Sequence, residues 1–158
     1  MNSRLAAGVL ALAPLFAQAA VCRIVSGSGL AFGTYDTLAS APRDSQTTLM
    51  VRCSGSGSPE VVTLMVGVDP GLHGTPGGMR RMMHTAGTAD ALAYNLYRDA
   101  GRSSSWGMST GVDTVPITIT VPATGSTSAA INIYARIPAR QEPRVGTYAD
   151  AVMVTIDY

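Results

Sequence analysis

Residue types that catalyse reactions are sparse in this chain of 158 residues. There are two histidines, His73 and His84, and both lie in segments rich in glycine, threonine and methionine, which indicates loops. His84, Asp90 and a nearby serine would supply the side chains of a nucleophilic triad, but no Gly-x-Ser-x-Gly turn accompanies them. We therefore do not expect an enzyme.

Candidate binding residues are equally few. Asp90 and Asp99 lack the spacing of a calcium-binding loop, and no glycine-rich loop follows a strand and opens a helix, as phosphate binding would require. No metal ion or other cofactor is therefore expected. Trp106 is a candidate ligand contact, because an exposed indole ring can stack on a sugar. The alternative is a tryptophan that anchors a loop in the core.

The first 19 residues have the pattern of a secretory signal peptide. Arg4 supplies the positive charge, Leu5–Phe16 forms a short apolar stretch, and Ala17–Ala19 reads small-x-small, as a cleavage site does. The apolar stretch is too short to span a bilayer, and no later stretch is long enough. We expect an exported protein whose single folded domain comprises residues 20–158.

Cys22 and Cys53 are the two cysteines of the chain. In an exported protein an even number of cysteines indicates a disulfide, and two widely separated cysteines make a poor metal site. We therefore expect a Cys22–Cys53 bond, the alternative being two free thiols. Such a bond stabilises a fold by about 3–4 kcal/mol for a loop of this size.

The charge of the predicted domain argues against polyanionic partners. Without Arg4, the eleven basic residues become ten, all arginine, and they balance ten acidic residues. Charged residues make up 13% of the chain, about half the usual level. We expect neither nucleic acid nor anionic lipid as a partner, and no membrane span.

Short runs of alternating apolar residues recur along the chain, separated by turns rich in glycine, proline and serine. This pattern is typical of a β-sandwich or barrel. Pro116 cannot donate to a ladder, so it indicates an edge strand, a strand start or a bulge. The methionines around Arg80 favour a loop that covers one end of a sheet, the alternative being a contact surface. The predicted strands are Thr47–Cys53, Val61–Val66, Leu92–Tyr97, Val115–Val121, Ile131–Ile137 and Tyr148–Tyr158.

The last predicted strand places Val152, Val154, Ile156 and Tyr158 on one face. Nothing follows it in the sequence to cover its far edge, and an uncovered apolar edge invites pairing with another chain. We therefore expect an extracytoplasmic domain whose open edge receives a strand from another protein.

Several motifs, taken in order, resemble the spore coat protein U domain family, whose better understood members are pilins of archaic chaperone–usher pathways. No single piece is decisive, but together they extend over nearly the whole predicted domain. They are Leu30–Asp36 after the first cysteine, Val51–Cys53, Met79-Arg80, Leu92–Asp99, Trp106-Gly107, Ile137-Pro138, Gln141 and Gly146–Val152.

The resemblance implies an incomplete immunoglobulin-like β-sandwich that lacks its last strand and is completed by donor-strand addition. It implies export through the periplasm to a surface fibre that serves adhesion or biofilm formation. The expected partners are a periplasmic pilus chaperone, an outer-membrane usher and other pilin subunits. The residues expected to line the donor-strand groove are Val152, Val154, Ile156, Ile24 and Phe32.

One feature departs from that family. Fibre-forming pilins of this kind carry a donor segment of about ten residues or more before the first cysteine, because a strand that fills a groove needs that length. Cleavage after Ala19 leaves Ala20 and Val21 before Cys22. We therefore expect a tip, initiating or accessory subunit. The alternatives are a stand-alone secreted coat or matrix protein and a carbohydrate-binding module that uses Trp106.

Overall fold

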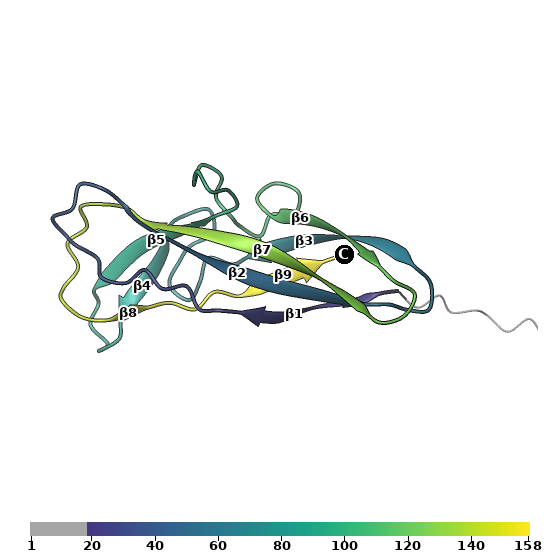
Figure 1. The fold of residues 1–158 in the computed structure, drawn as a ribbon. Coiled ribbons are helices and arrows are strands. Elements are labelled where there is room, and N and C mark those ends of the chain that lie inside the picture. Colours follow the sequence, from purple (N-terminus) through teal and green to yellow (C-terminus); the bar gives the residue numbers. More distant parts are fainter. Residues whose placement is uncertain (1–18) are drawn as a thin grey trace, which may run out of the picture.

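The computed structural model describes residues 19–158, so the predicted signal peptide lies outside the described residues except for Ala19. Two antiparallel sheets pack face to face in an elongated molecule (Figure 1). The larger sheet has the order β1 (Val21–Gly27), β2 (Arg43–Ser54), β7 (Ser126–Ile137), β5 (Ala91–Tyr97), β4 (Arg80–His84) and β8 (Tyr148–Ala149). The smaller has the order β6 (Val115–Val121), β3 (Glu60–Val68) and β9 (Val154–Asp157). The predicted all-β sandwich is confirmed.

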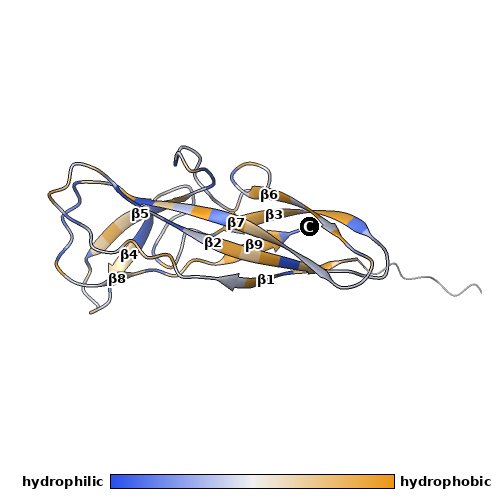
Figure 2. Cartoon of the chain, viewed as in Figure 1, coloured by the Kyte–Doolittle hydropathy of each residue, from blue (hydrophilic) through white to orange (hydrophobic). Residues whose placement is uncertain are grey.

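The core lies between the two sheets and is built from every second residue of each strand. Hydrophobic and hydrophilic residues alternate along β7, which places one set inside and the other in solvent (Figure 2). Burying one large aliphatic side chain contributes about 1.5–3 kcal/mol, so this inner layer dominates the stability. Its fully enclosed members include Val51, Leu64, Val66, Val68, Trp106, Val121 and Ile137.

The alternation in the sequence locates five strands correctly. The run Val115–Val121 matches β6 at both ends, and the other four lie inside the observed β2, β3, β5 and β7. β6 is an edge strand of the smaller sheet and Pro116 is its second residue, which confirms the placement inferred from the missing N–H.

The prediction of one continuous strand over Tyr148–Tyr158 is wrong. The chain forms β8 in the larger sheet, leaves it at Asp150, and re-enters the smaller sheet as β9 at Val154. Hydrogen bonds to the segment after β3 hold this crossing in place: the Leu72 N–H donates to the Ala151 carbonyl, and the Asp69 N–H to the Met153 carbonyl. Alternation alone could not show the change of sheet, because it continues across the break.

The prediction of a loop around Arg80 is also wrong. Residues 80–84 form β4, which pairs with β5 on one side and with β8 on the other. The sequence Arg-Arg-Met-Met-His has no alternation, because Arg80 itself faces inward and is buried. Burial of an arginine is rare enough that the hydrophobic pattern gives no sign of it.

A charged cluster on the exposed side of the larger sheet supports the long β2–β7 ladder. Arg136 donates two hydrogen bonds to the Asp44 carboxylate, at 2.7 and 2.9 Å, and Arg102 lies 3.3 Å from it. The hydrogen bond from Arg136 is the largest cause that holds the pKa of Asp44 below its usual value of 3.8. The ionised carboxylate is therefore favoured by the folded state.

This arrangement predicts a pH-dependent loss of stability. Because the pKa of Asp44 is lowered on folding, its ionised carboxylate stabilises the folded protein above about pH 4. This contribution to the free energy of unfolding is lost as the pH falls through the lowered pKa. Asp44→Asn should lower the urea midpoint at pH 7, by about 1 kcal/mol or less since the pair is partly in water, and should match wild type in strong acid. Glu142→Gln, at an exposed residue, is the control. A D44N deficit that persists in strong acid would contradict this assignment.

Candidate functional site

An open cleft of about 420 Å³ lies on the larger sheet, beside the start of β9. One rim is the segment that follows β1, residues 28–32, and the other is the segment from β8 into β9, residues 148–154. The inner face of the larger sheet forms its floor. The apolar side chains of the lining are Leu30, Phe32, Leu49, Met82, Tyr94, Leu96, Ile133, Tyr148, Val152 and Val154.

Aromatic packing fixes one end of the cleft, at Phe32 and Tyr94. The rings of Phe32 and Tyr94 meet edge to face with centroids 5.9 Å apart, and both residues are almost fully buried. The Arg43 guanidinium donates to the Phe32 carbonyl at 2.7 Å, which ties the irregular 28–42 segment to β2. The rim therefore holds its shape although its residues belong to no strand.

One acidic residue lies on this apolar lining. The Asp150 carboxylate accepts a hydrogen bond from the Tyr94 hydroxyl at 2.8 Å and another from the Leu72 N–H at 3.1 Å. Burial, followed by the bond to Asp150, raises the pKa of Tyr94 above its usual range, so the hydroxyl stays protonated and donates. Asp150 thus joins the cleft floor to the crossing segment.

The edge of β1 that faces away from β2 carries backbone groups that pair with no strand of the described residues. The Cα atoms of Cys22 and Cys53 are 4.0 Å apart, close to the spacing of a non-hydrogen-bonded pair in an antiparallel ladder. The N–H and C=O of Cys22, and those of Ile24 two residues on, therefore point away from β2.

The edge of β9 is arranged in the same way. The Asp69 N–H donates to the Met153 carbonyl, so this pair is hydrogen-bonded, and the next pair, Val68 with Val154, is not. By the same alternation, the N–H and C=O groups of Val154 and Ile156 point away from β3. No strand among residues 19–158 pairs with either edge.

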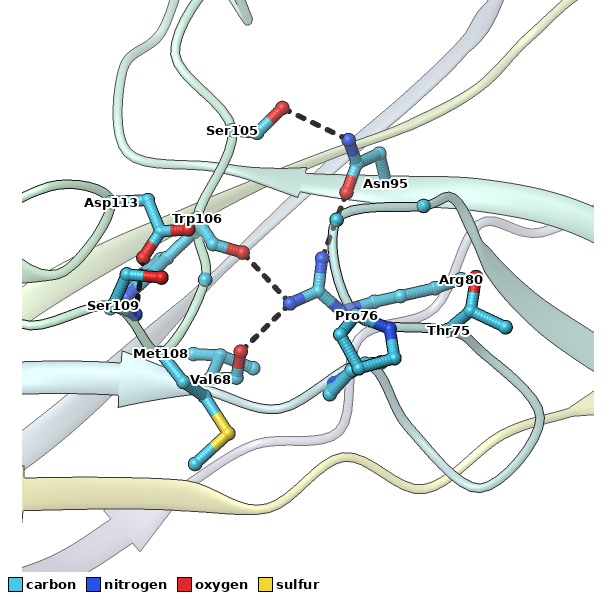
Figure 3. Close-up of a pocket in the computed structure, with 14 residues that line it drawn as sticks. Val68, Thr75, Pro76, Arg80, Asn95, Ser105, Trp106, Met108, Ser109 and Asp113 are labelled. Atoms are coloured by element: carbon cyan, nitrogen blue, oxygen red, sulfur yellow. Dashed lines mark hydrogen bonds between the residues drawn. The ribbon is translucent and has the colours of Figure 1, made fainter.

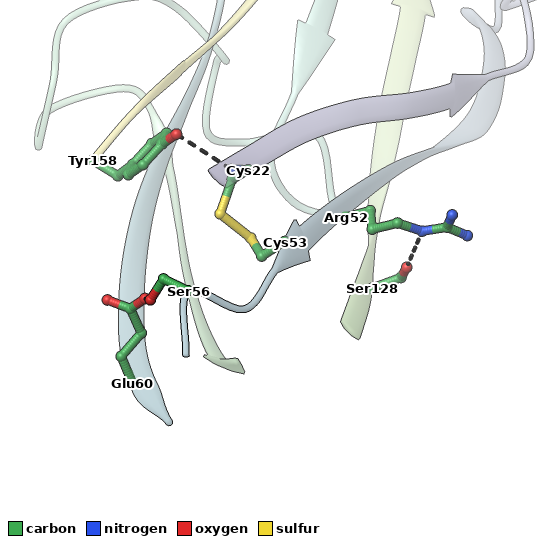
Figure 4. The surroundings of a disulfide bond; sticks show 7 residues. All are labelled: Cys22, Arg52, Cys53, Ser56, Glu60, Ser128 and Tyr158. Atoms are coloured by element: carbon green, nitrogen blue, oxygen red, sulfur yellow. Dashed lines mark hydrogen bonds between the residues drawn. A yellow bond between two sulfur atoms is a disulfide. The ribbon is translucent and has the colours of Figure 1, made fainter. Parts of the chain in front are cut away.

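The disulfide lies at the far end of these two edges (Figure 4). Cys22 and Cys53 are bonded, which confirms the predicted pairing and ties the first strand to the second. The Tyr158 side chain lies beside the disulfide, and its hydroxyl accepts a hydrogen bond from the Cys22 N–H at 3.2 Å.

A buried arginine holds the smaller sheet against the larger one (Figure 3). Arg80 on β4 is 4% exposed, and its Nε donates to the Asp69 carbonyl and its Nη1 to the Asn95 side chain. Its Nη2 donates to the carbonyls of Val68 and Trp106. Burial is the main cause that lowers the pKa of Arg80. The group borders a smaller hollow of about 200 Å³ and links the end of β3 to β4 and β5.

Trp106 is part of the core. It is 1% exposed, and its indole N–H donates to the Val66 carbonyl at 2.8 Å. A sugar needs an open ring face on which to stack, and this ring offers none. The structure therefore replaces the candidate ligand contact with the alternative given for it, a tryptophan that anchors a loop.

The residues considered for catalysis and metal binding are engaged elsewhere. Nδ1 of His84 accepts the Ala86 N–H, its Nε2 lies 3.2 Å from the Val145 carbonyl oxygen, and Asp90 pairs with Arg144. Within residues 19–158, no group of three or more histidines, cysteines or acidic residues is placed to hold a metal ion. The described part of the chain also contains no helix suited to crossing a membrane.

Three of the five residues predicted for the groove line the cleft: Phe32, Val152 and Val154. Ile156 is half-buried against the core further along β9, and Ile24 is 37% exposed on β1. Both lie on the free edges that continue the cleft toward the disulfide. Their contact with an added strand stays a prediction. Sequence reasoning did not find Tyr148 and Asp150, although both belong to the motif at residues 146–152.

Two solved structures share this fold. A chain of the CsuC–CsuE chaperone–tip adhesion subunit pre-assembly complex, from the archaic chaperone-usher Csu pili of Acinetobacter baumannii, aligns over 88% of this chain with a TM-score of 0.56 and 22% identity. A chain of a chaperone–tip adhesin complex of CFA/I fimbriae biogenesis aligns over 85% with a TM-score of 0.50 and 13% identity. In each case this protein spans 40% of the matched chain's length. The sandwich is thus of the type found in such complexes.

The sequence comparisons identify the family. Protein U of Myxococcus xanthus is 32% identical over 149 residues, which cover 87% of this chain and 77% of the relative. The family model of the Spore Coat Protein U domain matches residues 8–155. This protein belongs to the Spore Coat Protein U domain family.

Proposed function

We propose that this protein is an exported subunit of a chaperone–usher surface fibre and that it accepts a β-strand from another chain in the cleft. The observation that carries this proposal is the cleft itself, whose rims continue into two unpaired sheet edges. An extended segment laid between them would place alternate side chains on the apolar floor and offer its backbone to Ile24 and Val154. A periplasmic chaperone would supply that strand first, and a neighbouring subunit would replace it after passage through an outer-membrane usher.

The strand-acceptor proposal predicts that a strand supplied in trans stabilises the exported protein. A suitable probe is a synthetic peptide of about ten residues in which threonine and valine alternate. Because each large apolar side chain that enters the cleft contributes about 1.5–3 kcal/mol, saturating peptide should raise the melting temperature by about 10 °C. Differential scanning calorimetry with increasing peptide measures this shift.

A matched pair of variants separates the cleft from the rest of the surface. Val152 lines the cleft, whereas the side chain of its neighbour Met153 is exposed. Val152→Glu should abolish the peptide-induced shift, because it introduces a charge on an apolar rim of the cleft, and Met153→Glu should leave the shift intact. A wild-type melting temperature that ignores the peptide, or equal effects of the two variants, would rule out the cleft as the acceptor site.

We also propose that the subunit occupies the tip, initiates the fibre or is an accessory to it. The support is the predicted cleavage after Ala19, which leaves two residues before Cys22 and hence too little chain to fill a neighbour's cleft. The mass of the exported protein gives the cleavage site directly. Immunogold labelling then gives the position, and regular decoration along the shaft would exclude all three roles.

A stand-alone secreted coat or matrix protein is the second candidate, and the 32% identity to Protein U together with the family match favours it. Such a protein would complete its fold without a partner. It would melt cooperatively as a monomer and show no response to the strand peptide, so the calorimetric experiment distinguishes the two candidates.

A further inference from the structure

The two edges of the cleft are joined at one end by a single side chain. Tyr158, directly after β9, bonds through its hydroxyl to the backbone N–H of Cys22 on β1 at 3.2 Å (Figure 4). These residues are separated by 136 positions in the chain. Within residues 19–158 this is the hydrogen bond that bridges the free edges of β1 and β9.

The donor in this bond is a group that an added strand would need. The Cys22 N–H points away from β2, as does the N–H of Ile24, so both lie on the side where a further strand would pair. In the structure the Tyr158 hydroxyl accepts a hydrogen bond from the first of these two groups, the Cys22 N–H. The cleft is therefore open beside Phe32 and tied at the disulfide end.

We propose that Tyr158 is a latch on the strand-binding cleft, an inference that rests on the strand-acceptor function proposed above. In the empty protein the phenol holds the disulfide end of the cleft together. As a strand fills the cleft from the open end, the Cys22 N–H passes from the phenol oxygen to a carbonyl of the incoming strand, and the phenol returns to water. Tyr158 is 61% exposed, so little packing opposes its release.

The Tyr158–Cys22 hydrogen bond competes with the last backbone hydrogen bond that a bound strand forms. A substitution that removes the Tyr158 bond should therefore increase the affinity for the strand. Tyr158→Phe keeps the ring and removes the acceptor, so the empty protein loses a hydrogen bond that the filled protein does not have. A neutral hydrogen bond shifts an equilibrium by about three- to tenfold. Y158F should therefore bind a strand about three- to tenfold more tightly than wild type.

Amide hydrogen exchange tests the latch without any ligand. We compare protection factors, the ratios of the intrinsic to the observed exchange rate. In the wild-type exported protein the protection factor of the Cys22 amide should be about three- to tenfold higher than that of the Ile24 amide on the same edge, and Y158F should remove that difference. Tyr134→Phe on β7 is the control, because the Tyr134 hydroxyl has no hydrogen-bond partner in the described part of the chain and its ring lies under Arg102. Y134F should exchange as wild type does.

Titration with the alternating threonine–valine peptide then separates the two proposals. Tighter binding by Y158F than by wild type and Y134F supports the latch. Equal binding by all three proteins, or equal protection factors of the Cys22 and Ile24 amides in wild type, overturns the latch and leaves the acceptor function standing. A wild-type protein that never binds the peptide overturns both.

Discussion

Replacing Arg80 with methionine is expected to lower the free energy of unfolding by about 3–5 kcal/mol. Methionine has a similar length but no donors, so the carbonyls of Val68, Asp69 and Trp106 lose their partner in a buried site. Each buried acceptor left without a hydrogen bond costs about 1–3 kcal/mol, less where water can enter. Urea denaturation followed by the fluorescence of Trp106 measures the loss.

The neighbouring residue provides the control for this prediction. Arg81 lies on the same strand with its side chain in solvent, so Arg81→Met should change the stability by about 0.5 kcal/mol or less. Similar losses in the two variants would show that Arg80 contributes through the charge of β4 alone. A much larger loss in R80M assigns the effect to the bonds that join the two sheets.

Removing the disulfide with Cys22→Ala and Cys53→Ala together is expected to cost about 3–4 kcal/mol. The bond closes a loop with a sequence separation of 31, and its loss frees the unfolded chain. It also removes the covalent link between β1 and β2, so the yield of exported protein should fall sharply. Thermal melting of the double variant, compared with oxidised wild type, measures the cost, and reduced wild type serves as the control.

The reduced wild-type protein and the double variant should melt at nearly the same temperature, because both lack the same cross-link. A double variant as stable as the oxidised protein would show that the bond is not structurally important. A double variant far less stable than the reduced protein would instead indicate that the small side chains leave a cavity at Cys53, which is fully buried.

Most of the strands follow from the sequence because each has one buried face. Ile117, Ile119 and Val121 alternate with threonine, and the observed β6 buries this set progressively toward its end. The disulfide could also be predicted, because export and an even cysteine count suffice. Such features depend on residues close together in the chain.

The features that the sequence did not predict depend on contacts between distant segments. The change of sheet after β8 requires Asp69 and Asp150 to bind backbone groups about 80 residues away in the chain, as in the bonds from Met153 and Leu72. The strand at Arg80 is stabilised by four hydrogen bonds to groups outside β4. Neither arrangement produces a periodic pattern of apolar residues in the sequence. The cleft was predicted only in part, because its floor comes from β2, β4, β5 and β7 together.

The position of the Cys22–Cys53 bond has a mechanical consequence. Ladder hydrogen bonds in an antiparallel sheet run across the strands, so tension applied along β1 shears them together instead of opening them one by one. The disulfide passes that tension from β1 directly into β2, whose twelve residues are all paired with β7. A pull on a strand bound beside β1 would thus be distributed over the twelve residue pairs of the β2–β7 ladder.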